Sequence, residues 1–212
     1  SAFHKIYHPY LSVIKELIER VNFGKISFVR HYFSHLGPYT SHDARSKIKW
    51  FFDSEMAGGG VLLDLGVHSI DLFRYLFGDF VMIKGCVSNT TCVDISAEDN
   101  ASVLFTLKGD TIGSIQSSWC NHPRDLLEIH GTEGTIWLDF LSEEPFSYYP
   151  EDLDDPLIKR LITLKYPKKN PLHYPLIDHF MRSILNQRQD HPNFEDGKRA
   201  VEFVLDAYSF QP

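Results

Sequence analysis

Residues 57–72 read Ala57-Gly58-Gly59-Gly60-Val61-Leu62-Leu63-Asp64-Leu65-Gly66-Val67-His68-Ser69-Ile70-Asp71-Leu72. After the glycine triplet, apolar side chains surround most of the circumference of a helix that ends at Gly78, so this helix must be largely buried. Its polar residues share one stripe, with spacings of i, i+4, i+7 and i+11: Asp64, His68, Asp71 and Tyr75. Because a buried polar group without a partner costs several kcal/mol, the stripe must face partners or a water-filled cleft.

An Asp one helical turn before a His is a sensible acid–base unit. The carboxylate of Asp64 can orient the His68 imidazole and raise its basicity, and His68 can then move a proton near neutral pH. The spacing also allows a purely structural interpretation, in which Asp64 complements the helix dipole and His68 is a core histidine. The glycine triplet lacks the G-x-G-x-x-G spacing of a dinucleotide site, and it can instead be a loop that lets the backbone pack closely. Spacing alone leaves both interpretations open.

Outward from this helix, the pattern predicts helices and strands in the order of an α+β domain. Helices are predicted over residues 9–20, 174–187 and 195–209. Residues 2–7 are predicted to be the end of a strand whose beginning is missing, and further strands are predicted over 25–35, 80–90, 98–107, 111–120, 125–131, 135–140 and 160–165. Residues 108–110 and 132–134 fall where tight hairpin turns belong. This order predicts an open, largely antiparallel sheet with helices on one face.

The composition excludes several classes of function. The 212 residues carry 28 acidic and 21 basic side chains, a formal charge of −7, which argues against nucleic-acid binding because that depends on concentrated Lys and Arg. Three cysteines without a C-x-x-C pair suit a reducing compartment. The longest apolar region, residues 58–78, contains Asp64, His68, Asp71 and Arg74, so we do not expect it to span a bilayer. With no charged-then-apolar leader visible, we expect a soluble, cytoplasmic protein.

The stretch 57–72, together with Trp50 and Asp53 before it, closely resembles the signature of the Gfo/Idh/MocA oxidoreductases, which include glucose–fructose oxidoreductase and inositol dehydrogenases. Other segments resemble the same family along nearly the whole chain: residues 3–9, Leu17-Ile18-Glu19, Gly24-Lys25-Ile26, Gly131-Thr132-Glu133-Gly134-Thr135, Asp196-Gly197 and Ala200-Val201-Glu202. The resemblance implies the family's C-terminal domain, of the dihydrodipicolinate reductase and glyceraldehyde-3-phosphate dehydrogenase type. Residues 1–8 would be the remnant of a crossover from a missing nucleotide-binding (Rossmann) domain, and 9–212 the substrate-binding and oligomerisation domain.

The resemblance also implies an activity. The family uses NAD or NADP to oxidise or reduce a carbon of a sugar, polyol or related hydroxy compound. Its catalytic Asp and His map onto Asp64 and His68, and His4 occupies a position that faces the cofactor. The family's catalytic Lys and its glycine-rich fingerprint lie on the nucleotide domain and have no counterpart here, so we expect this chain alone to bind no cofactor and to be inactive. Substrate identity and the choice between NAD and NADP stay open.

The residues implied to bind substrate follow the first and fourth strands of the predicted sheet. They are His35, Asn121, His122 and Arg124, and each can equally be a solvated loop residue. Phe51 follows Trp50 where many family members have Arg, and this departure weakens any inference about polar substrates. A metal site is not expected, because positions i and i+4 of a strand, such as His31 and His35, lie about 13 Å apart.

Two other functions remain possible for this fold: an NAD-assisted glycosidase, and a non-catalytic dimerisation or binding module. Whichever function applies, we expect the chain to self-associate through the sheet face that points away from the helices. The alternation places on that face, from two neighbouring strands, Ser102, Leu104, Thr106, Ser114, Gln116 and Ser118, and we expect mostly short polar side chains and almost no long charges there. We therefore expect a homodimer or a dimer of dimers through this face, with a merely exposed sheet as the alternative.

Overall fold

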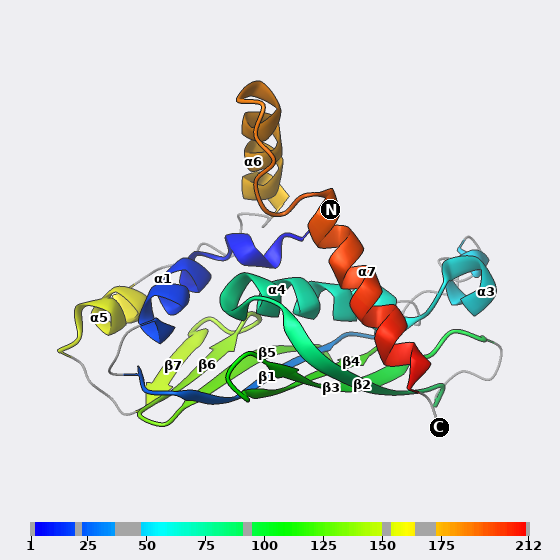
Figure 1. Cartoon of the computed structure of the whole chain (residues 1–212), viewed down its shortest axis with the longest axis horizontal. Coiled ribbons are helices and arrows are strands. Elements are labelled where there is room, and N and C mark those ends of the chain that lie inside the picture. The colour runs from blue at the N-terminus through cyan, green and yellow to red at the C-terminus, as the bar shows by residue number, and fades with distance from the viewer. Residues whose placement is uncertain are drawn as a thin grey trace.

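A seven-stranded sheet forms the base of the molecule, in a computed structural model that describes residues 3–19, 23–36, 48–90, 95–149, 154–163 and 173–210 (Figure 1). The strands lie in the order β2-β3-β4-β1-β5-β6-β7. Their bounds are β1 Ile26–Ser34, β2 Phe80–Ser88, β3 Asn100–Leu107, β4 Ile112–Ser118, β5 Arg124–Gly131, β6 Thr135–Asp139 and β7 Phe146–Tyr149. Strands β1 and β4 pair in parallel and every other neighbouring pair is antiparallel. The predicted largely antiparallel sheet is confirmed.

Both predicted hairpin turns are present. Between β3 and β4, Gly109 and Asp110 adopt positive φ angles of 83° and 67°, a conformation that suits a tight turn between twisted strands. The Leu107 amide donates to the Thr111 carbonyl at 2.9 Å and closes this turn. Between β5 and β6, the Gly131 amide donates to the Gly134 carbonyl at 2.7 Å. These turns set the strand register that decides which side chains face the helices.

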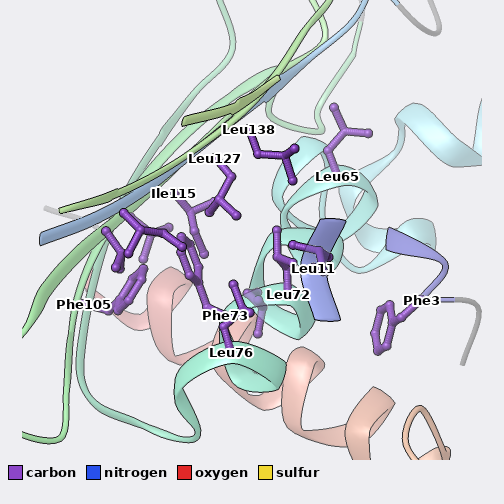
Figure 2. Packing of buried hydrophobic residues seen from close by; sticks show 14 of the residues in the cluster. Phe3, Leu11, Leu65, Leu72, Phe73, Leu76, Phe105, Ile115, Leu127 and Leu138 are labelled. Atoms are coloured by element: carbon purple, nitrogen blue, oxygen red, sulfur yellow. The ribbon is translucent and has the colours of Figure 1, made fainter. Parts of the chain in front are cut away.

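The helices cover one face of the sheet, as predicted, and α4 crosses that face near its centre (Figure 1). Their bounds are η1 Lys5–Tyr7, α1 Pro9–Ile18, η4 Lys49–Phe52, α3 Ser54–Ala57, η5 Leu62–Gly66, α4 Val67–Phe77, α5 Pro156–Thr163, α6 His173–Leu185 and α7 Phe194–Ser209. Figure 2 shows Phe73 of α4 beside Ile115 and Phe105 of the sheet. Each is almost fully buried, and burial of such a side chain contributes about 1.5–3 kcal/mol. The core is therefore the interface between helices and sheet.

Two predicted strands are wrong. The segment near 160–165 is helical as far as Thr163 in α5, and Asp155 stabilises the start of that helix by accepting from the Leu157 amide at 2.7 Å. Residues 164 and 165 lie outside the described part of the chain. At the N-terminus, η1 is a 3₁₀ helix, and Lys5 and Ile6 in it are buried. The alternation in both segments is too short to distinguish a strand from a helix.

The long buried helix is not a regular α-helix. Its first part, η5, is a π-helix, a wider turn that is frequent at functional sites. Glu98 holds the start of this turn, because its carboxylate accepts from the Leu62 amide at 3.1 Å and its carbonyl accepts from the Val61 amide at 2.9 Å. By length and composition alone the stretch Ser54–Phe77 is apolar enough to cross a membrane, but 61% of its most apolar window is buried inside the protein. A core helix of this kind meets the same criteria.

The outer face of the sheet differs from the expectation in one respect. Leu104 and Ser102 do point outward, while their neighbours on β3 are buried. However, Arg30 and Glu128 also lie on this face with their charged groups 4.0 Å apart, so long charges are present. Their neighbour Ser114 is only 3% exposed because it lies between Leu104 and Arg30 in the register. The predicted uniform surface of short polar side chains is therefore wrong.

Candidate functional site

Asp64 lies in the π-helical turn, where its carboxylate meets the sheet. The Trp119 indole, which follows β4, donates to Asp64 Oδ2 at 2.9 Å. Burial raises the pKa of Asp64, and the bond from Trp119 and the nearby His35 oppose that rise. Among the described contacts Asp64 has no hydrogen bond to His68. The predicted role of Asp64 in orienting the imidazole therefore stays a prediction, and the carboxylate is oriented by Trp119.

His68 stands at the start of α4 in an aromatic setting. Its ring centre lies 5.9 Å from that of Phe3, 5.2 Å from that of His4 and 6.4 Å from that of Phe33. Burial, together with charge repulsion from His4 and Lys5, lowers the pKa of His68 to about 3. The imidazole is thus uncharged at neutral pH. That His68 moves a proton near neutral pH stays a prediction. Its Nδ1 is buried and has no hydrogen-bond partner among the described residues.

Beneath His68 lies a buried polar network that the motif did not indicate. Asp125 on β5 pairs with Lys5 of η1, and its Oδ1 lies 2.9 Å from His31 Nε2. The other ring nitrogen of His31, Nδ1, lies 2.6 Å from the hydroxyl of Ser69, the residue after His68. All four side chains are at most 6% exposed as residues. One signal was available in the sequence, because the alternation places His31 on the same strand face as the buried Val29.

The residues predicted to bind substrate do not lie together. His35 is on the inner side, with its ring centre 6.0 Å from that of Phe33 and its charge close enough to lower the pKa of Asp64. The other three, in contrast, line a hollow of about 530 Å³ on the outer face of the sheet: Asn121, His122 and Arg124. Asn121 donates to the hydroxyl of Tyr32, which also lines that hollow. The structure therefore separates these three from Asp64 and His68.

The glycine triplet serves close packing. A Cβ at Gly60 would lie 2.2 Å from the Glu98 carbonyl oxygen, and one at Gly59 would lie 2.3 Å from the Tyr208 hydroxyl. The Tyr208 hydroxyl itself donates to Glu98 at 2.6 Å and accepts from the Gly60 amide at 3.3 Å. The triplet thus lets the backbone approach Glu98 and Tyr208 closely. His4, assigned to the cofactor by resemblance, has its ring between those of His68 and His173, at 5.2 and 4.7 Å.

The second half of the polar stripe holds helices together. Asp71 is 1% exposed and lies 3.2 Å from Nε2 of His191, whose Nδ1 lies 3.0 Å from Asp196 at the start of α7. Arg74 reaches the same Asp196 carboxylate at 3.2 Å. Tyr75 packs its ring beside His191 at 5.9 Å. The stripe therefore divides into a site-forming part, Asp64 and His68, and a part that joins α4 to α7.

The sequence is similar to a known family and to sugar dehydrogenases. A family model described as the GFO/IDH/MocA C-terminal domain matches residues 12–137. A levoglucosan dehydrogenase from Pseudarthrobacter phenanthrenivorans is 28% identical over 167 residues, which are 66% of this chain and 41% of the relative. A D-apiose dehydrogenase from Paraburkholderia graminis is 31% identical over 84 residues, 37% of this chain and 22% of the relative.

Solved structures share the fold. A levoglucosan dehydrogenase in complex with NADH superposes with a TM-score of 0.77 at 20% identity, covering 99% of this chain and 64% of that one. The WlbA dehydrogenase from Bordetella pertussis, in complex with NADH and UDP-GlcNAcA, superposes with a TM-score of 0.81 at 18% identity, covering 98% of this chain and 60% of that one. The chain thus spans less than two thirds of these relatives. Because the family model matches more than half of its residues, the chain belongs to the Gfo/Idh/MocA family, as part of that family's C-terminal domain.

Proposed function

We propose that this chain is the substrate-binding and acid–base part of an NAD(P)-dependent dehydrogenase that acts on a sugar, polyol or related hydroxy compound. The observation that carries the proposal is the position of Asp64 and His68, one helical turn apart on the helix-covered side of the sheet, with the Asp64 carboxylate bound by the Trp119 indole at 2.9 Å. The named relatives support the substrate class, because they are dehydrogenases of levoglucosan and D-apiose.

The residues of this chain would do the proton chemistry. A substrate hydroxyl placed at His68 would donate its proton to an imidazole nitrogen, which is free to accept it because the ring is uncharged. Asp64, held by Trp119, would lie ready to accept a hydrogen bond from a second substrate hydroxyl. A nicotinamide bound elsewhere in the protein would supply the acceptor for a hydride from the same carbon, so that loss of the proton and of the hydride would leave a carbonyl.

We also propose a cytoplasmic homodimer or dimer of dimers that pairs through the outer face of the sheet. Leu104 and Ile112 support this proposal, because they lie on neighbouring strands of that face and are 55% and 52% exposed. Apolar side chains grouped on an open sheet favour an isologous contact.

The test is a substrate screen with the intact protein that carries this chain. Sugars, polyols and anhydrosugars are offered with NAD⁺ and with NADP⁺, and formation of the reduced cofactor is followed by absorbance. We expect one molecule of reduced cofactor per molecule of carbonyl product. Bond cleavage without net cofactor reduction would show an NAD-assisted glycosidase instead. Turnover that is unaffected by His68→Ala would contradict the proposed role of His68.

A further inference from the structure

Helix α6 has an apolar face that lies open to solvent. Figure 1 shows α6 standing away from the body of the molecule, and none of its 13 residues, all of which the structure describes, is buried. One face of α6 presents five apolar side chains that are at least half exposed: Tyr174 72%, Ile177 59%, Met181 50%, Ile184 56% and Leu185 77%. Apolar side chains grouped in this way at a surface mark a site of contact with another body.

These five side chains form one stripe along the helix, the α6 stripe. Counted from Tyr174 they follow at i+3, i+7, i+10 and i+11, which is the spacing of the buried face of an amphipathic helix. Phe180, at i+6, lies at the border of the stripe, where it lines a hollow of about 900 Å³ with the loop that follows α6. A helix of this length is marginal in water on its own, so its stability normally comes from packing of the apolar face.

The N-terminal segment of the chain lies against the foot of α6. The ring centre of His4 is 4.7 Å from that of His173, the first residue of α6, and the ring centre of Tyr7 is 5.5 Å from that of His179. A part of the protein that precedes His4 is therefore tethered next to α6. The solved relatives are long enough to hold such a part, because this chain covers 64% of the levoglucosan dehydrogenase and 60% of the WlbA dehydrogenase.

Two other occupants of the stripe fit the structure less well. A second copy bound through the outer face of the sheet would leave the stripe open, because α6 stands on the other side of the sheet (Figure 1). A membrane surface attracts amphipathic helices whose polar face is rich in Lys and Arg. The charged residues of α6 are one Arg and one Asp, Arg182 and Asp178, and they pair with each other at 2.8 Å.

We propose that the α6 stripe is the surface against which the cofactor-binding part of the intact protein packs, through an apolar patch of its own. The proposal rests on the proposed function, which places the nicotinamide in a part of the protein outside this chain. That part would then lie close to the candidate site, because the His4 ring lies between those of His173 and His68, at 4.7 and 5.2 Å. The contact would thus bring the hydride acceptor to the side of the domain where His68 lies.

The first experiment is photo-crosslinking in the intact protein, with p-benzoylphenylalanine in place of Met181 or, in a second variant, of Leu185. After irradiation and digestion, mass spectrometry should find α6 peptides joined to peptides that precede Ser1 in the same chain. Arg182 is the control position, because its side chain is 72% exposed and lies outside the stripe, and we expect no such products from it. Cross-links between two chains, cross-links confined to residues 1–212, equal products from position 182, or no products would each overturn the proposal.

Hydrogen exchange of the intact protein provides a second readout. We expect the α6 amides of the wild type to exchange about tenfold or more slowly than those of Met181→Lys, because a lysine in the packed stripe opens the contact. Arg182→Lys is the matched control, since it places a lysine at the next position, outside the stripe, and it should exchange like the wild type. Equal exchange in the wild type and in Met181→Lys, or equal acceleration in Arg182→Lys, would contradict the proposal.

Failure of this contact can be told apart from failure of the proposed function, because neither readout needs turnover. Calorimetry of the intact protein with NAD⁺ and with NADP⁺ measures cofactor binding separately. A protein that binds cofactor but gives no cross-link from the α6 stripe would refute the contact and leave the proposed function standing. A protein that gives the cross-link but binds neither cofactor would refute the proposed function, and with it the assignment of the packed part as the cofactor-binding one.

Discussion

The indole of Trp119 donates to Asp64 at 2.9 Å and so ties the end of strand β4 to the π-helical turn that begins the buried helix. This bond gives the partly buried carboxylate of Asp64 a partner from the sheet, and among the described contacts it has no side-chain partner on its own helix. It also leaves His68, one turn further on, with an aromatic environment and no bond from Asp64 among the described contacts. The two residues of the motif are therefore held by different parts of the fold, and their loss should have different effects.

Replacement of His68 by Ala in the intact enzyme should lower kcat by about 10²–10⁴-fold, the usual range for a lost general acid or base. Asp64→Asn should cost less, because the amide oxygen can still accept from Trp119 while the negative charge is lost. Steady-state kinetics with the preferred substrate measure both. Thermal unfolding is the control, and a variant that loses stability as well as turnover would not support a chemical role.

The contact of His191 with the carboxylates of Asp71 and Asp196 should make the free energy of unfolding depend on pH. Burial opposes the charged form of His191, but the two carboxylates together raise its pKa above the ordinary value near 6.5. The stabilisation is therefore fully present below that value and is lost as pH rises through the folded-state pKa. In urea, the free energy of unfolding of the wild type should fall as pH rises from below 6.5 to above the folded-state pKa of His191. His191→Gln should remove this part of the pH dependence. If the free energy of unfolding of that variant changes with pH as in the wild type, other groups cause the dependence.

Gly60→Ala should destabilise the fold by about 1–3 kcal/mol or more, because the added methyl would meet the backbone of Glu98 at 2.2 Å and neither side can give way cheaply. Gly109→Ala is a suitable control. Its methyl meets nothing within 4 Å, so the cost is limited to the strained positive φ, about 1 kcal/mol. Chemical denaturation compares the two, and equal losses would mean that close packing at Gly60 is unimportant.

Loss of an aromatic side chain should destabilise the fold much more on helix α7 than on helix α6. Figure 1 shows α6 standing away from the body, and its Phe180 is 61% exposed, whereas Phe203 of α7 is 2% exposed and packs 4.4 Å from the ring centre of Phe80. Phe203→Ala should cost about 3–5 kcal/mol, and Phe180→Ala within about 0.5 kcal/mol. Denaturant midpoints measure both changes. A large loss at Phe180 would mean that α6 packs more closely in solution.

Self-association through the outer sheet face should be broken by Leu104→Lys combined with Ile112→Lys, which places like charges on an exposed apolar patch. These positions are better than Gln116 and Ser118 of β4, because Ser118 is 2% exposed and bonds to Asn100. Light scattering at tens of micromolar should change from dimer or tetramer to monomer. A second pair on α6, Ile177→Lys with Ile184→Lys, is the control and should leave the assembly intact. A monomeric wild type would refute the idea.

Much of the fold follows from the sequence because its signals are local. The alternation over residues 101–107, the turn at Gly109 and the apolar helix before Gly78 each depend on neighbours a few residues apart. The motif around Asp64 and His68 was recognisable for the same reason. A packing role for the glycine triplet was one interpretation that the sequence left open, and the packing partners, Glu98 and Tyr208, were not visible in it.

Only the tertiary structure decided how the site is built, because its contacts join residues that are far apart in the chain. The pairing of β1 with β5 brings His31 to Asp125, and Lys5 joins them from η1. No local pattern marks a buried lysine. Strand register sends Asn121 to Tyr32 on the outer face, away from His68. Side-chain identity, then, determined which chemistry is available, whereas register and burial determined which groups meet and in what charge state.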